Sequence, residues 1–248
     1  MKILVCISHV PDTTSKINFT ADNSAFDSNG IQFVINPNDE FGLTKAVQLK
    51  EQLGGSITVV NVGDPTTEPT LRKALAIGAD EAIRVNCEAK DSFQVAQELA
   101  AIAKEGEYDL ILCGKESIDY NGSAVHTMLA SLLDFPIVNA CIGLDLDGTN
   151  ATMVREIEGG KETVTASLPL VIGGQKGLVE ETELRIPNMR GIMSARSKPL
   201  HVKEPVNAPA LTIHAQFEKP APKADVKLIE AGNEQELVEL LHKEAKVI

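Results

Sequence analysis

The chain has 248 residues, of which 43% are hydrophobic and 4% aromatic, so we expect a large core of aliphatic side chains. Its formal net charge of −12 argues against a nucleic acid or an anionic membrane surface as the main partner. No apolar run approaches the length of a membrane span, and the four cysteines form no CxxC pair. Since the first apolar run begins at residue 3, leaving no room for a signal peptide, we predict a reduced, cytoplasmic protein without membrane insertion.

The first half of the chain alternates short apolar runs with helical patterns. We predict strands at residues 3–8, 33–35, 57–62, 81–85 and 110–113, with helices after residues 39, 70, 92 and 123. Such alternation is typical of a doubly wound parallel sheet, in which the strand at 3–8 is central. Asp39 and Ser123 are predicted to cap the helices that follow them.

Polar loops follow the predicted strands at residues 8–13, 36–39, 63–65 and 114–122. Because the carboxyl ends of parallel strands gather at one edge, these loops should meet where a nucleotide would lie. The helix after Ser123 would present unpaired amides to an anion. The chain contains no GxxxxGK[ST], GxGxxG, HExxH or GxSxG motif, so we predict a nucleotide-binding scaffold without a visible catalytic set.

After residue 136 the pattern changes to alternating runs at 138–146, 152–157 and 162–168, followed by a strand at 170–172. These runs predict an antiparallel sheet added to the first unit, with a turn at 158–161. A proline-rich stretch after residue 203 predicts an extended arm that leads to a terminal helix at 233–245.

Residues 184–203 are unusual in an acidic chain, because they hold five Lys or Arg residues and no Asp or Glu. Apolar side chains are interleaved with the charges. The segment is either a solvated loop or short helix that balances the acidic residues before it, or a docking surface with apolar anchors and a basic rim.

Six stretches resemble the β subunit of electron transfer flavoprotein: residues 2–13, 36–39 with 49–51, 74–80, 114–115 with 117–119, 154–163 with 168–171, and 191–199. The resemblance implies a heterodimer whose α subunit carries the redox FAD. It implies an adenine-nucleotide-binding fold related to universal stress proteins, with an added antiparallel hairpin and a C-terminal arm. The nucleotide-binding domain would span residues 1–200, with a recognition loop at 184–200, and residues 201–248 would pack on the partner subunit.

The resemblance also implies two sets of functional residues. The nucleotide site would include Cys6, Ser8, Asn36, Pro37, Asn38, Asp39, Val62, Gly63, Gly114, Lys115, Ser117, Ile118, Asp119, Asn121, Gly122, Ser123, Ala124 and Val125. Docking on acyl-CoA dehydrogenase-type flavoproteins would use Arg185, Met189, Ile192, Met193 and Arg196, with Met189 as the anchor.

The family's β subunits bind either AMP as a structural ligand or, in electron-bifurcating members, a second FAD with NADH as the donor. Residues 10–13 resemble the bifurcating branch, whereas Ala124 and His126 depart from the usual phosphate loop, and we therefore favour AMP. We expect an electron carrier subunit in fatty acid or amino acid oxidation, not an enzyme by itself. A nucleotide sensor similar to universal stress proteins is the alternative of another class.

Overall fold

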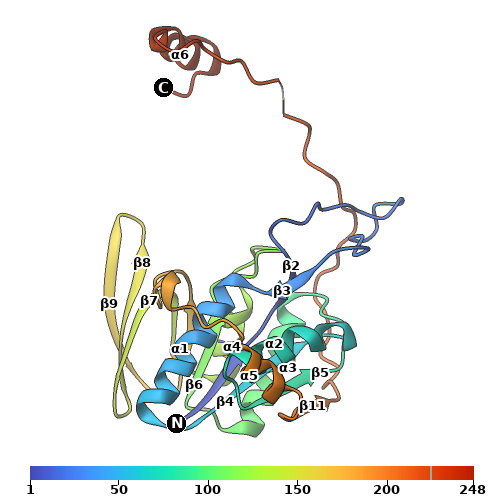
Figure 1. The fold of residues 1–248 in the computed structure, drawn as a ribbon, viewed down its shortest axis with the longest axis vertical. Helices are drawn as coiled ribbons and strands as arrows, with labels where there is room; N and C mark the ends of the chain where they lie inside the picture. Colours follow the sequence, from blue (N-terminus) through green and yellow to red (C-terminus); the bar gives the residue numbers. More distant parts are fainter. Residues whose placement is uncertain (224) are drawn as a thin grey trace.

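The computed structural model describes residues 1–223 and 225–248, and its centre is a nine-stranded sheet in the order β11-β5-β4-β1-β6-β10-β7-β8-β9 (Figure 1). The strands from β11 to β7 run parallel, and β7, β8 and β9 form antiparallel hairpins. The strand bounds are β1 Lys2–Cys6, β4 Ser56–Val62, β5 Glu81–Val85, β6 Leu110–Gly114, β7 Ile137–Asp147, β8 Asn150–Ile157, β9 Gly160–Ser167, β10 Leu170–Gly174 and β11 Leu200–Lys203.

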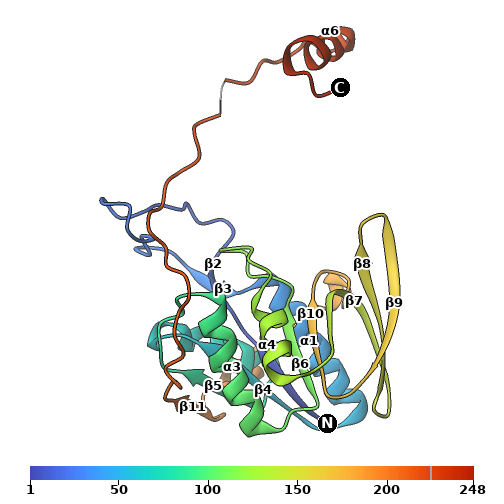
Figure 2. The ribbon, with the colours of Figure 1, turned by 180° about the vertical axis from the view of Figure 1, so that it is seen from behind.

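Helices cover both faces of the parallel strands, which confirms the doubly wound α/β fold. One face carries α1 (Pro37–Leu53), α2 (Glu68–Ile77) and α5 (Met189–Ala195), and the opposite face carries α3 (Ser92–Gly106) and α4 (Val125–Leu133) (Figures 1 and 2). Short 3-10 turns at Pro65–Thr67 and Glu181–Glu183 complete these connections.

The core is aliphatic, as the composition predicts, and it is divided by the sheet into two layers. Along β1, Ile3 and Val5 pack toward α1 and α2, whereas Leu4 and Cys6 pack toward α3 and α4. This two-residue alternation follows from strand geometry, in which successive side chains point to opposite faces. The side of the sheet that holds Cys6 therefore faces the helix pair α3 and α4.

Two expectations about the strands were wrong. Residues 9–11 do not form a loop, because β2 (His9–Pro11) pairs with β3 (Phe33–Ile35) in a separate antiparallel sheet. The strand at 170–172 does not extend the antiparallel part. Instead β10 lies between β6 and β7 and runs parallel to both. The antiparallel addition is therefore limited to β7, β8 and β9.

The C-terminal part leaves the sheet through β11, which pairs with β5 at the edge. The extended arm that follows leads to α6 (Glu234–Leu240) and a π-helical turn at Leu241–Ala245, away from the body of the molecule (Figure 1). The domain division at residue 200 and the packing of the arm on a partner stay predictions. In the part of the chain that the structure describes, no helix is long and apolar enough to cross a bilayer.

Candidate functional site

A cavity of about 490 Å³ opens where β1, β4 and β6 end, on the side of the sheet that carries α3 and α4. Its floor includes Cys6, Val62 and Cys113, one residue from each of these strands. Its size falls in the range of small-molecule sites, and the carboxyl edge of a parallel sheet is the usual place for a ligand in this class of fold.

Asp39 fixes the strand ends beside this cavity. Its carboxylate accepts the amide of Ser8 at 2.7 Å with one oxygen and the amide of Gly114 at 2.7 Å with the other. Any side chain at Gly114 would collide with this carboxylate, since a Cβ there would stand 2.4 Å from Oδ1. Burial raises the pKa of Asp39 to about 6, although both amides favour the charged form. The predicted cap role of Asp39 is wrong, because α1 begins after Asn36 and Asp39 joins β1 to β6.

Asn36 and Asn38, close to Asp39 in the sequence, fix the loop that follows β6 through hydrogen bonds. Asn36 and Asn38 donate their side-chain amides to the carbonyl of Glu116, at 2.9 and 3.1 Å. The Asn36 side-chain oxygen in turn accepts the amide of Ile118 at 3.2 Å. These three contacts position the loop 115–124 against α1, so the Asn-Pro-Asn-Asp stretch supports the cavity more than it lines it.

The loop 115–124 places the N-terminus of α4 at the cavity. Asn121 and Ser123 have positive φ angles of 49° and 47°, which turn the chain sharply before the helix. The Ser123 hydroxyl donates to the carbonyl of Lys115 at 2.8 Å, so it does not cap α4 as predicted. The cap residue is Ala124, which has no side-chain acceptor, and the first amides of α4 stay available to an anion at the cavity wall.

Two residues that line the cavity, Asn61 and His126, each hold a buried polar atom without a hydrogen-bond partner among the described residues: Asn61 Oδ1 and His126 Nε2. Asn61 donates its amide to the carbonyl of Ile7 at 2.8 Å, which fixes the side chain and leaves its oxygen free. Burial lowers the pKa of His126, an effect that nearby Asn139 partly offsets, so its imidazole is neutral at pH 7. Burying such atoms without partners is costly, so each of these two lining residues carries an unsatisfied polar group beside the cavity.

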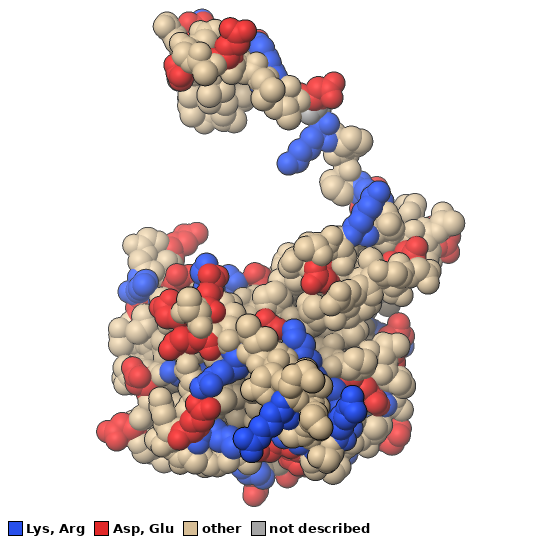
Figure 3. Space-filling model, in the orientation of Figure 1, with Lys and Arg blue, Asp and Glu red and all other residues tan. Residues whose placement is uncertain are grey.

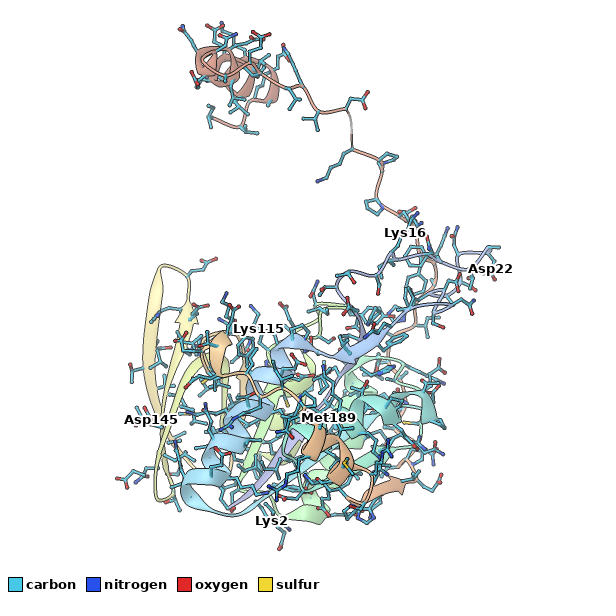
Figure 4. The ribbon with its side chains drawn as sticks, viewed as in Figure 1. Lys2, Lys16, Asp22, Lys115, Asp145 and Met189 are labelled. Atoms are coloured by element: carbon cyan, nitrogen blue, oxygen red, sulfur yellow. The ribbon has the colours of Figure 1, made fainter. Side chains whose placement is uncertain are left out.

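The structure brings most of the predicted nucleotide residues to this one cavity. Those that line it are Cys6, Ser8, Asp39, Val62, Gly63, Gly114, Lys115, Ser117, Asp119, Gly122, Ser123, Ala124 and Val125. The lining does not include Asn36, Pro37, Asn38, Ile118 or Asn121, which stand behind it or in the loop turn. Their roles toward a ligand stay predictions. In Figure 4, Lys115 stands at the upper rim of the body, above the ends of the strands.

Sequence reasoning missed several residues that line the cavity. Asn61 had a readable signal, because it interrupts the apolar run of β4. Asp91, at the N-cap of α3, had a weaker one. Thr212 and His214 had none, since they reach the cavity from the C-terminal arm.

A second candidate surface is the basic segment around α5. Met189 and Met193 are 74% and 69% exposed, and Ile186 and Ile192 are exposed beside them. Figure 3 shows Lys and Arg side chains gathered over the part of the molecule where α5 lies, and Figure 4 places Met189 at its centre.

Some of the cations in this segment have internal partners. Arg185 pairs with Glu51 at 2.6 Å, and the Lys198 ammonium donates to the carbonyls of Leu75 and Ala79 at the end of α2. Arg72 adds two bonds of 2.8 Å to the carbonyls of Ala195 and Lys198. These contacts hold α5 against α2 and leave its apolar side chains on the outside.

Among the described residues, no group of three or more His, Cys, Asp or Glu side chains is arranged to hold a metal ion. The groups that the cavity offers to a ligand include the first amides of α4 and the side chains of polar residues in its lining.

Comparisons with known proteins agree on one family. Residues 24–208 match the electron transfer flavoprotein domain. The electron transfer flavoprotein subunit beta of Bacillus subtilis is 37% identical over the full length of both chains. The human protein of the same name is 33% identical over 83% of this chain and 82% of its own. The chain belongs to the beta subunit family of the electron transfer flavoproteins.

Proposed function

We propose that this chain binds AMP as a structural ligand in the cavity at the ends of β1, β4 and β6. The observation that carries the proposal is the start of α4 at the cavity, where the cap residue Ala124 leaves the first amides of the helix without a side-chain acceptor and the polar residues Asn61 and His126 stand among the lining. A mononucleotide offers both kinds of group that this wall requires: a phosphate for the helix amides and a base with hydrogen-bonding edges. A ligand there would bridge three strands and two helices and stabilise the folded chain.

The chain acts as one subunit of a heterodimer, with an electron transfer flavoprotein alpha subunit that carries FAD. Its relatives are named subunit beta, which supports an assembly of this kind. Within it, this chain would complete the FAD site of the partner and act as an electron carrier subunit without catalysis of its own. The arm supports the assembly, because Leu237 and Val238 on α6 are 46% and 54% exposed and suited to burial against another chain.

The surface around α5 is proposed to dock on acyl-CoA dehydrogenase-type flavoproteins. Met189, Met193 and Ile192 supply an exposed apolar centre, and Arg190 and Arg196 supply charge around it. A small apolar anchor with a charged rim favours fast association and fast release, which suits electron exchange between transient partners.

The alternative is a second FAD in the same cavity, as in an electron-bifurcating subunit that takes electrons from NADH. One contact favours it: the His9 ring lines the cavity and stacks on Phe33, with 4.3 Å between ring centroids and 5° between planes. The His9 ring, supported by Phe33 behind it, gives the cavity an aromatic edge against which a flavin ring could lie.

Nucleotide analysis of the purified complex tests both readings. The chain is co-expressed with its alpha partner, the complex is purified and denatured, and the released nucleotides are identified by mass. One FAD and one AMP per complex are expected. Two FAD would establish the alternative, and the absence of a stable complex would contradict both.

A further inference from the structure

The start of the C-terminal arm is attached to α3 by two carboxylates that bind its backbone. Glu98, only 1% exposed, accepts the amide of Val206 at 2.8 Å and that of Ala208 at 3.1 Å. At the N-cap of the same helix, Asp91 accepts the amides of Leu211 and Thr212 at 2.6 and 2.8 Å. Hydrogen bonds to charged acceptors are the stronger kind, so α3 fixes the path of the arm.

This path brings the arm to the nucleotide cavity. Thr212 and His214 line the cavity together with Asp91 and with Tyr120 from the loop before α4. The rings of His214 and Tyr120 stack at 4.8 Å with 18° between their planes. Figure 2 shows the arm passing alongside α3 and on toward the N-terminal loop. The cavity therefore has one wall that belongs to the arm.

Beyond the cavity the arm is attached a third time, to the N-terminal loop. The Phe217 amide donates to the carbonyl of Asn23 at 2.9 Å, and its ring lies 5.2 Å from that of Phe19. Lys219 adds a bond of 2.6 Å to the side chain of Asn18. In a chain with only two Tyr and seven Phe residues, this line of rings from Tyr120 through His214 to Phe217 is a notable concentration.

We propose that residues 205–217, here called the strap, form a removable wall of the nucleotide site. The inference rests on the proposed function, and it adds Asp91, Tyr120, Thr212 and His214 to the site. Apart from the rings of His214 and Phe217, the strap is attached mainly through its backbone, and Leu211 and Ile213 on it are 66% and 86% exposed. A segment with so little buried apolar surface can open without unfolding the sheet behind it. The nucleotide then exchanges only while the strap is lifted, and strap opening sets the release rate.

The test measures release of radiolabelled AMP from the complex of this chain with its alpha partner, during a chase with excess unlabelled AMP. Glu98→Gln removes one charge-assisted acceptor from the strap, and His214→Ala removes the stack on Tyr120. Glu105→Gln is the matched control, because Glu105 lies on the same helix but pairs with Lys203, before the strap begins. We expect AMP release at least about tenfold faster in the double variant Glu98→Gln with His214→Ala, and unchanged in the control.

Limited proteolysis gives a second measurement. Bound AMP should slow cleavage within residues 205–217 of the unmodified complex, because ligand and closed strap stabilise each other. Equal AMP release from the double variant and the unmodified complex would overturn the strap proposal. A complex that takes up no AMP at the loading step would instead overturn the proposed ligand, so the two failures are separate; if FAD is found, the same chase is run with flavin fluorescence.

Discussion

Asp39 makes the stability of this protein depend on pH in the direction opposite to most carboxylates. Its pKa rises from the ordinary value of 3.8 to about 6 in the folded chain, because burial disfavours the charge. The folded state therefore prefers the protonated form, and stability falls as pH rises from about 4 to above 6. A difference of about 2 pKa units corresponds to about 3 kcal/mol in total, of which about 1.3 kcal/mol falls between pH 5 and pH 7.

The substitution Asp39→Asn removes this ionisation. Asn can accept only one of the two amides that Asp39 binds, which costs about 1–3 kcal/mol at every pH, but it carries no charge to bury. We therefore expect the stability of the variant relative to the native chain to improve by about 1.3 kcal/mol between pH 5 and pH 7.

Urea unfolding at a series of pH values measures this difference. The matched control is Glu40→Gln, which removes the adjacent carboxylate from a partly exposed ion pair with Lys73. If the Asp39→Asn and native stabilities run parallel from pH 5 to pH 7, the buried carboxylate does not titrate in this range and the reasoning is wrong.

Two further substitutions test the docking surface and the core. Met189→Ala should slow single-turnover electron exchange with the partner dehydrogenase by about tenfold, while stability changes by less than about 0.5 kcal/mol, because the side chain is 74% exposed. Unchanged exchange would remove Met189 from the anchor role. Leu112→Ala, at a fully buried position of β6, should cost about 3 kcal/mol in urea unfolding, and a loss below about 1 kcal/mol would show that this layer is loosely packed.

Most strands of the parallel sheet could be predicted from the sequence because they are short, mainly apolar runs. The edge strand β11 was missed, because its sequence Leu-His-Val-Lys alternates apolar and polar residues at the end of the basic segment. The position of β10 could not be predicted, since its local pattern is the same whether it extends a hairpin or enters the sheet between β6 and β7. Only pairing across long sequence distances decides this. The short strand β2 was missed because Pro11 weakens its strand pattern.

The site was predicted where chain neighbours determine it and missed where distant segments meet. The loop 114–125 could be located from a strand followed by glycines and a helix start. The hydrogen bond between Asp39 and Gly114 joins residues that are 75 positions apart in the sequence, and the one between Glu98 and Val206 joins residues that are 108 positions apart. A local pattern can only assign a carboxylate such as Asp39 to its commonest role, a helix cap.

The cations that hold α5 against α2 change what an approaching partner would meet. Residues 184–203 carry five positive charges. Arg185 and Lys203 form ion pairs with carboxylates, and Lys198 donates hydrogen bonds to helix carbonyls. Arg190 and Arg196 are exposed and, among the described residues, are not in an ion pair. Because hydrogen bonds to neutral carbonyls leave the charge of Lys198 in place, long-range attraction at this surface is then that of about three charges on an acidic molecule. Since carboxylates already neutralise Arg185 and Lys203, the association rate should depend less on ionic strength than the five charges of the sequence suggest.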